Sequence, residues 1–265
     1  MARLAGKKAI VVGGGQTPGA TIGNGRATAL RFAQEGATVA VLDRRVESAE
    51  ETVAMIEEAG GQGFALRLDV TEEASCHAVL NEAIARLEGV DILHNNVGIG
   101  TGDATPHHID ADVWDAIFDT NVKSIMFTCK VVIPHMREQR AGVVTNISSV
   151  AAVASATNIT AYKTSKAAVN AYTQALAMNN ARYGIRANVI MPGLMNTPMA
   201  IEGYVAAGQD RAAVIARRDA AVPLGGKMGS AWDVANAALF LASDEAAFIT
   251  GVMLPVDGGQ AAKVG

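Results

Sequence analysis

Short apolar segments alternate with longer segments of helical periodicity along the chain of 265 residues. This alternation is typical of βαβ units, in which a helix returns the chain to the start of the next parallel strand. The expected strands are Ala9–Val12, Thr38–Leu42, Phe64–Leu68, Asp91–His94, Val143–Ile147, Arg186–Met191 and Val252–Val256. The expected helices are Gly25–Glu35, Val46–Ala59, Glu72–Leu87, Asp112–Glu138, Ala161–Tyr183 and Ala231–Ala242.

The expected strands are continuous apolar runs, which is the pattern of strands that helices cover on both faces. No linker rich in proline and serine, charge block or fixed repeat divides the chain. We therefore predict an α/β fold with one domain over residues 1–265, a doubly wound parallel sheet of about seven strands with helices on both faces. Residues 196–229 follow the end of a strand, where open α/β sheets place their ligand crevice, so we expect them to form a substrate lid.

The composition disfavours several classes of function. The formal net charge is −4, so the chain carries no electrostatic footprint for nucleic acid. It contains no run of about 20 apolar residues, so no membrane partner is expected, and its first residues do not resemble a secretory signal. Cys76 and Cys129 fit neither a disulfide framework nor a metal site. A cytoplasmic protein without a metal is expected.

A glycine-rich turn follows the first expected strand. It begins with Gly13–Gly15, and the next helix begins at about Gly25, after Gly23 and Asn24. Glycine lets the backbone turn tightly and approach a pyrophosphate, whose charge is favoured by the free N–H groups of a helix N-terminus. A plain flexible turn is the alternative explanation of such a cluster, but its place in the first βα connection favours dinucleotide binding.

The second expected strand leads into Asp43. A carboxylate at this position accepts hydrogen bonds from both ribose hydroxyls and repels a 2′-phosphate, so it favours NAD over NADP. The adjacent Arg44 and Arg45 weaken this inference, because a guanidinium accommodates the phosphate.

Tyr162 and Lys166 are placed to share one face of an expected helix. Hydride transfer to a carbonyl leaves an alkoxide that must be protonated, and the reverse reaction needs a base. Free tyrosine is a poor base at neutral pH, but a nearby ammonium favours the phenolate and lowers its pKa. Ser149 lies at a strand end, where its hydroxyl would stabilise charge on the substrate oxygen. Asn121 lies inside an expected helix, where a polar amide usually faces solvent.

Taken together, these features resemble the short-chain dehydrogenase/reductase family, in its branch with subunits of roughly 250 residues. The resemblance extends from about Lys7 to Gly259. Besides the Tyr–Lys pair it rests on Asp69-Val70, Asn95-Asn96-Val97-Gly98, Asn121-Val122, Pro192-Gly193 followed by Thr197, and Asp257-Gly258-Gly259. Each motif is common by chance, whereas their joint order and spacing are specific.

The resemblance implies roles for the reacting residues. Tyr162 would be the general acid/base, and Ser149 would orient and polarise the substrate oxygen. Ser148 is the competing serine, but the family's spacing to the tyrosine selects Ser149. Lys166 would bind the nicotinamide ribose and tune Tyr162, while Asn121 would hold a water in a proton relay through Lys166.

The resemblance also implies cofactor contacts and an assembly. The further contacts are Asp69 and Val70 at the adenine, Asn95, Gly98, Pro192 and Gly193 along the cleft, and Thr197 at the nicotinamide carboxamide. Tetramers are usual in this branch and dimers occur, with long helices such as Asp112–Glu138 and Ala161–Tyr183 packing across the interface. A homotetramer is therefore expected.

The glycine turn departs from the family's TGxxxGxG pattern. About six extra residues lie within Gln16–Ile22, and Val12 occupies the usual threonine position. One interpretation is a harmless surface extension, since loops tolerate insertion. The other is that Gln16 and Thr17 reach the adenosine ribose or the pyrophosphate and adjust cofactor choice.

The expected substrate pocket is mainly apolar. It would be built from Ile99–Asp103, Val150–Asn158 and Leu194–Gly208, with Ser149, Val150, Tyr162 and Leu194 touching the substrate. We therefore expect a neutral or mostly apolar secondary alcohol or ketone.

Two alternative functions are weighed. One is reduction of a 3-oxoacyl thioester on a carrier protein, a role that usually prefers NADPH and a basic surface; Asp43 and the acidic balance oppose it. The other is a non-catalytic NAD(H)-binding regulatory protein, which the complete set of reacting residues opposes.

Overall fold

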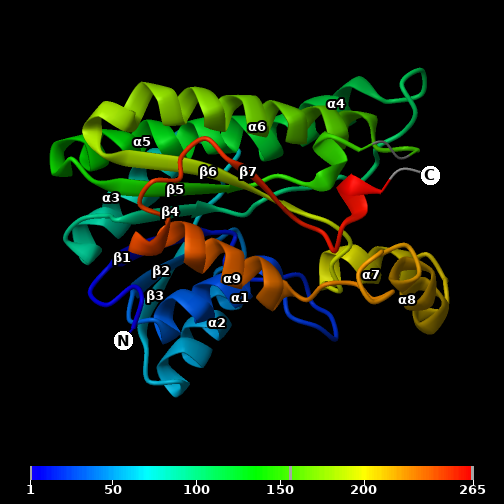
Figure 1. Cartoon of the computed structure of the whole chain (residues 1–265), viewed down its shortest axis with the longest axis horizontal. Coiled ribbons are helices and arrows are strands. Elements are labelled where there is room, and N and C mark those ends of the chain that lie inside the picture. Colours follow the sequence, from blue (N-terminus) through cyan, green and yellow to red (C-terminus); the bar gives the residue numbers. More distant parts are fainter. Residues whose placement is uncertain (1, 155–156, 264–265) are drawn as a thin grey trace.

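The computed structural model describes residues 2–154 and 157–263. Its centre is a seven-stranded parallel sheet with the strand order β3-β2-β1-β4-β5-β6-β7 (Figure 1). The strands are β1 Lys8–Val12, β2 Thr38–Asp43, β3 Gln62–Arg67, β4 Ile92–Asn95, β5 Gly142–Ile147, β6 Ile185–Pro192 and β7 Met253–Val256. The order reverses direction between β1 and β4, where doubly wound sheets open a crevice. The predicted fold class and the number of strands are confirmed.

Helices cover both faces of the sheet, in the two layers that Figure 1 shows. The helices are α1 Asn24–Gln34, α2 Val46–Glu58, α3 Glu73–Leu87, α4 Ala111–Phe118, α5 Ser124–Gln139, α6 Thr160–Asn180, α7 Pro198–Ala206, α8 Arg211–Asp219 and α9 Ala231–Ala242. Alternate residues of β1 feed the two cores: Ile10 and Val12 pack with α3, α5 and α6, whereas Ala9 and Val11 pack with α1, α2 and α9. Burial on both faces explains why the strands are continuously apolar.

The single helix expected over Asp112–Glu138 is wrong. The chain forms α4, then a π-helical turn at Asp119–Lys123, then α5. A π-turn accommodates one extra residue per turn and is frequent at functional sites. Here it contains Asn121, whose side chain is fully buried, so the amide does not face solvent as a helical position usually would.

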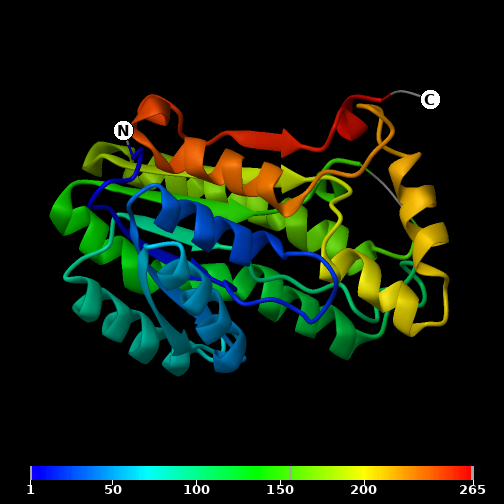
Figure 2. The same ribbon diagram turned by 90° about the horizontal axis from the view of Figure 1, so that it is seen from below.

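Residues 196–229 contain α7 and α8, which extend beyond the carboxyl ends of the strands (Figure 2). They have a small apolar core of their own, made of Ile201, Val214, Val222 and Met228. This segment therefore packs largely on itself beside the main sheet.

Across residues 2–154 and 157–263, the helices lack the combination of length and apolar character needed to cross a bilayer.

His94 on β4 is a buried titratable group, so it links the stability of the core to pH. Its Nδ1 lies 2.7 Å from Thr145 Oγ1, and burial lowers the pKa of the imidazole from 6.5 to about 3. The folded-state pKa is below the unfolded value, so the stability contributed by neutral His94 is present above pH 6.5 and is lost as the pH falls towards 3. We expect His94→Gln, which keeps a polar partner for Thr145, to make the free energy of unfolding less dependent on pH below neutrality.

The measurement is urea unfolding of both proteins at pH 7 and pH 5. The wild type should lose roughly 2 kcal/mol more than the variant over this interval. Equal losses would show that the protonation of His94 does not drive acid unfolding.

Candidate active site

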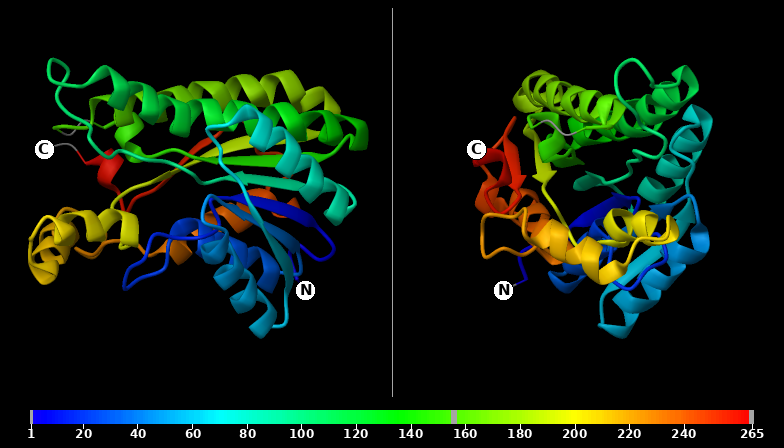
Figure 3. Two further views of the ribbon diagram at one scale, coloured as in Figure 1. Left: turned by 180° about the vertical axis from the view of Figure 1, so that it is seen from behind. Right: turned by 90° about the vertical axis from the view of Figure 1, so that its right-hand side faces the viewer.

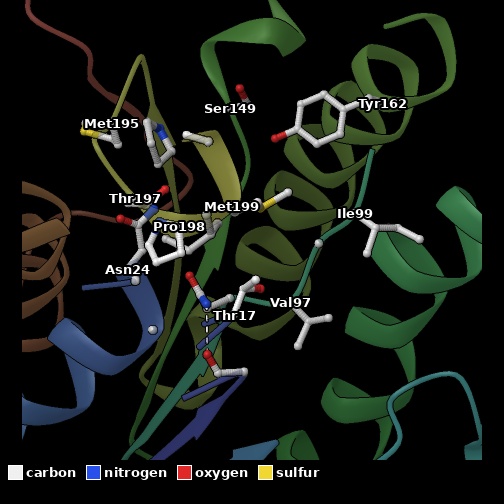
Figure 4. Close-up of a pocket in the computed structure, with 18 of the residues that line it drawn as sticks. Thr17, Asn24, Val97, Ile99, Ser149, Tyr162, Met195, Thr197, Pro198 and Met199 are labelled. Carbon is white, nitrogen blue, oxygen red and sulfur yellow. Dashed lines mark hydrogen bonds between the residues drawn. The ribbon is translucent and has the colours of Figure 1, made fainter. Parts of the chain in front are cut away.

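A cleft of about 1080 Å³ lies along the carboxyl ends of the strands. One end is formed by the glycine turn after β1, and the other by residues after β4, β5 and β6. Figure 4 shows Asn24 towards one end, and Ser149 and Tyr162 close together at the other. Side chains expected to bind a dinucleotide and side chains expected to react thus line one continuous cavity.

The glycine turn allows a very close approach between two backbone segments. A Cβ on Gly25 would lie 1.9 Å from the carbonyl oxygen of Gly13, so only glycine fits there. Gly13 itself has a φ of +79°, and its N–H donates to the Leu42 carbonyl at 2.7 Å. At the start of α1, Asn24 Oδ1 is buried and has no hydrogen-bond partner among the described residues. No side chain caps the start of α1, and the free N–H groups of this helix N-terminus fit a pyrophosphate.

Gln16 closes the extended turn. Its side-chain oxygen accepts the N–H of Gly23 at 3.0 Å, and its backbone N–H donates to Ser48 Oγ at 2.9 Å. The guanidinium of Arg45 donates to the Gln16 carbonyl oxygen. Gln16 therefore braces the loop from within, and both Gln16 and its neighbour Thr17 line the cleft.

Asp43 lies at the end of β2 in the wall of the cleft. Its carboxylate accepts the N–H of Gly15 at 3.1 Å and the N–H of Arg45 at 3.0 Å. Because the Arg45 guanidinium is engaged by the turn, Arg44 is the arginine of this pair left to meet a 2′-phosphate.

The reacting end of the cleft combines Ser149, Tyr162 and Lys166. Burial raises the pKa of Tyr162, and a hydrogen bond with Ser149 opposes that rise. Lys166 Nζ donates to the Ile147 carbonyl at 3.0 Å and lies 5.7 Å from the centre of the Tyr162 ring. Burial lowers the pKa of this ammonium to about 8. The expected fall in the Tyr162 pKa is therefore wrong for this cleft, in which desolvation is the larger effect.

The two neighbouring serines have different partners. The hydroxyl of Ser148 is buried and donates to the Lys166 carbonyl at 2.9 Å. Ser149 accepts the N–H of Ala151 at 3.1 Å and retains its contact with Tyr162. The geometry thus brings Ser149 to the tyrosine, as the spacing suggested.

Asn121 clamps the loop after β4. Its Oδ1 accepts the N–H of Ile99 at 2.7 Å, and its Nδ2 donates to the Ile99 carbonyl at 2.9 Å and to Ser165 Oγ at 2.9 Å. The amide thereby links the π-turn, the loop and α6. Both atoms of the Asn121 amide are thus engaged by protein atoms.

Of the two residues expected to line the cleft after β4, Gly98 lines it and Asn95 does not. Asn95 points into the protein, where it donates to Asn146 at 2.8 Å and accepts from Thr128 at 2.9 Å. The cleft is lined by Asn96 instead, whose amide donates to the Gly13 carbonyl at 3.0 Å. A Cβ on Gly98 would lie 2.8 Å from Lys166 Nζ, so glycine leaves room at this point of the cleft.

Most of the other expected residues line the cleft: Val70, Asp69, Pro192, Gly193, Thr197, Val150 and Leu194. Two hydrogen bonds from Thr71 lower the pKa of Asp69. Within the predicted segment 150–158, residues 155–156 lie outside the described residues.

Some lining residues were missed by sequence reasoning. Gln260 accepts the N–H of Leu194 at 2.7 Å, although the two are remote in sequence. Arg218 on α8 places a cation in the wall of the expected substrate region, and no motif marks it. Met195, which belongs to the expected pocket segment Leu194–Gly208, also lines the cleft. Within the described residues, no cluster of three or more His, Cys, Asp or Glu side chains is arranged to hold a metal.

Comparison with known proteins identifies the family. A family model described as Enoyl-(Acyl carrier protein) reductase matches residues 19–261. The 2,5-dichloro-2,5-cyclohexadiene-1,4-diol dehydrogenase of Sphingobium indicum is 38% identical over 258 residues, which cover 97% of each chain. The 3-oxoacyl-[acyl-carrier-protein] reductase of Thermotoga maritima is 35% identical and covers 97% of this chain and 98% of its own.

Solved structures agree. A short-chain dehydrogenase/reductase from Burkholderia xenovorans is 37% identical with a TM-score of 0.95 and covers 100% of both chains. A 7α-hydroxysteroid dehydrogenase, complexed with NADH and 7-oxo glycochenodeoxycholic acid, is 34% identical with a TM-score of 0.86, and the match covers 97% of this chain and 95% of that one. The chain belongs to the short-chain dehydrogenase/reductase family.

The buried ammonium of Lys166 makes a prediction about stability. Its folded-state pKa of about 8 lies below the unfolded value of about 10.4. Between these values the unfolded chain holds one proton more, so the stability of the wild type rises with pH across this window. Lys166→Met removes this dependence, and any stability advantage of the variant at pH 7 should shrink by roughly 3 kcal/mol by pH 10.5.

Chemical denaturation of both proteins at pH 7, 9 and 10.5 measures the difference. Parallel stability curves would mean that Lys166 is not held with a depressed pKa.

Proposed function

We propose that the protein is an NAD(H)-dependent oxidoreductase that interconverts a secondary alcohol and a ketone on a mostly apolar carbon frame. The observation that carries the proposal is the convergence of Ser149, Tyr162 and Lys166 in the cleft that begins at the glycine turn. The dehydrogenase names of its relatives are consistent with it.

The residues of the cleft fit a dinucleotide. The start of α1 and the glycine turn would bind the pyrophosphate, and Asp43 would accept the adenosine ribose hydroxyls. The other proposed contacts are Gln16, which braces the turn, Gly23, Asp69 and Val70 at the adenine, Asn96, Gly98, Pro192 and Gly193 along the cleft, Lys166 at the nicotinamide ribose and Thr197 at the carboxamide. The nicotinamide ring, when bound, supplies or accepts the hydride.

The protein's own residues would then manage the proton. In reduction, Tyr162 donates its phenolic proton to the substrate oxygen, which Ser149 also holds by a hydrogen bond. In oxidation, the Tyr162 phenolate removes that proton. The positive charge of Lys166 stabilises the phenolate. Since its amide is engaged by Ile99 and Ser165, Asn121 would hold a relay water through its backbone.

Apolar side chains line much of the proposed substrate region, and Arg218 on α8 adds a cation to its wall. Ile99, Val150, Leu194 and Met199 line this part of the cleft, which supports a substrate of low polarity. Residues 196–229 form the proposed lid, because α7 contributes Met199 and Tyr204 to the cleft wall while packing in a separate small core. In this proposal the whole chain, residues 1–265, acts as one domain.

A homotetramer is the proposed assembly. Met126 on α5 is 40% exposed and Met178 on α6 is 64% exposed, which supports the packing of these helices against another subunit. A reducing compartment, the cytoplasm, is proposed on the basis of two free, buried cysteines, Cys76 and Cys129.

Reduction of a 3-oxoacyl thioester is the second candidate. The Thermotoga maritima relative, a 3-oxoacyl-[acyl-carrier-protein] reductase, favours it. Against it stand Asp43 in the cleft wall and the acidic balance of the chain. The complete catalytic set opposes a purely regulatory, NAD(H)-binding role.

The first test follows NADH formation from NAD⁺ with cyclopentanol, 2-butanol, 1-phenylethanol and sorbitol, alongside Tyr162→Phe. We expect turnover with a cyclic or aryl alcohol and a loss of at least about 100-fold in the variant, because the acid/base group is removed. Binding of NADH, followed by fluorescence, should be retained. Full activity of Tyr162→Phe would overturn the assignment. If no alcohol of the panel is oxidised and the enzyme reduces acetoacetyl-CoA with NADPH in a parallel assay, the second candidate is favoured.

Asp43 gives a separate prediction about cofactor choice. In Asp43→Ser, the repulsion of a 2′-phosphate is removed and Arg44 remains in the wall, so the ratio of kcat/KM for NAD⁺ to that for NADP⁺ should fall by about 10-fold or more. Steady-state kinetics with both cofactors measure this ratio. A wild type that prefers NADP⁺ would contradict the prediction at once.

A further inference from the structure

The first turn of α6, which carries Tyr162, has no cap from its own sequence. The residue at the N-cap position is Ile159, whose side chain provides no acceptor. The first N–H groups of a helix have no partner within the helix and need one from elsewhere. In this chain the partner is Asp103, remote in sequence, in the loop after β4.

Both carboxylate oxygens of Asp103 accept backbone hydrogen bonds, from α6 and from the loop itself. Oδ2 accepts the N–H of Tyr162 itself at 2.7 Å, and Oδ1 accepts the N–H of Ala161 at 3.1 Å and that of Ala104 at 2.8 Å. Hydrogen bonds to a carboxylate are stronger than those between neutral groups, and an anion at a helix N-terminus is favoured further by the helix dipole.

Other contacts of the same loop support the side chain of Tyr162. The hydroxyl of Thr160 donates to the Ala104 carbonyl at 2.6 Å. A Cβ on Gly100 would lie 3.1 Å from the Tyr162 ring, so the backbone of the loop packs against that ring. At its other end the loop is held by the two hydrogen bonds between Ile99 and Asn121. The strap formed by residues 99–104 thus joins the π-turn to the first turn of α6.

We propose that Asp103 is a positioning residue for the reaction: by capping α6 from the strap, it fixes Tyr162 in the place from which the phenol meets the substrate oxygen. This inference rests on the proposed acid/base role of Tyr162. Small displacements of a reacting group cost large factors in rate, on the order of 100-fold for about 1 Å. Asp103 acts on kcat through Tyr162, and the cofactor site at the start of α1 is independent of it.

The test compares Asp103→Ala, Asp103→Asn and the matched control Asp91→Ala. Asp91 also accepts a backbone N–H, that of Lys8 at 2.8 Å, but it precedes the amino end of β4, whereas the cleft lies at the carboxyl ends of the strands. The substrate is the alcohol that the wild type oxidises fastest. In Asp103→Ala, kcat for this alcohol should fall by about 10- to 100-fold. The KM for the alcohol and the Kd for NADH should change less than about two-fold. Asp103→Asn keeps one acceptor oxygen and should lose less than Asp103→Ala. Asp91→Ala should retain the wild-type kcat.

Hydrogen–deuterium exchange adds a readout that does not depend on turnover. The amides of Ala161 and Tyr162 should exchange faster in Asp103→Ala and at the wild-type rate in Asp91→Ala. Unchanged exchange, unchanged kcat, or a loss of kcat equalled by Asp91→Ala would overturn the proposal. If the wild type turns over none of the panel, the proposed function fails, while faster exchange at these two amides would still support the capping role.

Discussion

A chain of buried hydrogen bonds holds together the elements on which the site is built. Thr128 on α5 donates to Asn95 on β4, Asn95 donates to Asn146 on β5, and Asn146 donates to Thr173 on α6, all within 2.8–2.9 Å. Asn95 and Asn146 are register partners in neighbouring parallel strands. Buried amides are costly unless fully paired, so this network favours one alignment of β4 with β5. That alignment determines how the loop to Ile99 faces the residues after β5.

The same network shows where sequence reasoning succeeds and where it stops. The strands and most helices were predictable, because periodicity and apolar runs are local signals. Asn95 was assigned to the cleft because a motif gives its position in the chain but not the direction of its side chain, and Asn96 faces the cavity instead. The break in the helix over 112–138 was not predictable, because the π-turn coincides with a tertiary clamp, Asn121 on Ile99. Arg218 reaches the cleft wall only because α8 folds back.

Desolvation at the reacting end of the cleft explains why the pKa of Tyr162 differs from the value expected from the sequence. From the sequence alone, the ammonium of Lys166 is expected to lower the pKa of Tyr162. In the folded protein both groups are buried, and desolvation disfavours the charged form of each, raising the pKa of Tyr162 and lowering that of Lys166. Burial therefore favours the protonated phenol of Tyr162, which suits proton donation by the tyrosine to a carbonyl oxygen. With a pKa of about 8, Lys166 still carries its positive charge at neutral pH. Such a site costs folding stability at neutral pH, which the apolar cores on both faces of the sheet must offset.

The extended glycine turn lines the cleft through Gln16 and Thr17 and also approaches α7. It is not a free surface loop, because a Cβ on Gly19 would lie 2.8 Å from Pro198 Cβ and 2.7 Å from Glu202 Oε1. Figures 2 and 3 show the turn beside α7 in different views. Glu202 in turn pairs with Arg211 of α8 at 2.6 Å. Gln16, for its part, closes the loop from within. Since the extension contacts both the dinucleotide end of the cleft and α7, shortening it would alter both together, and single substitutions at Thr17 and Gly19 separate the two effects more cleanly than a deletion.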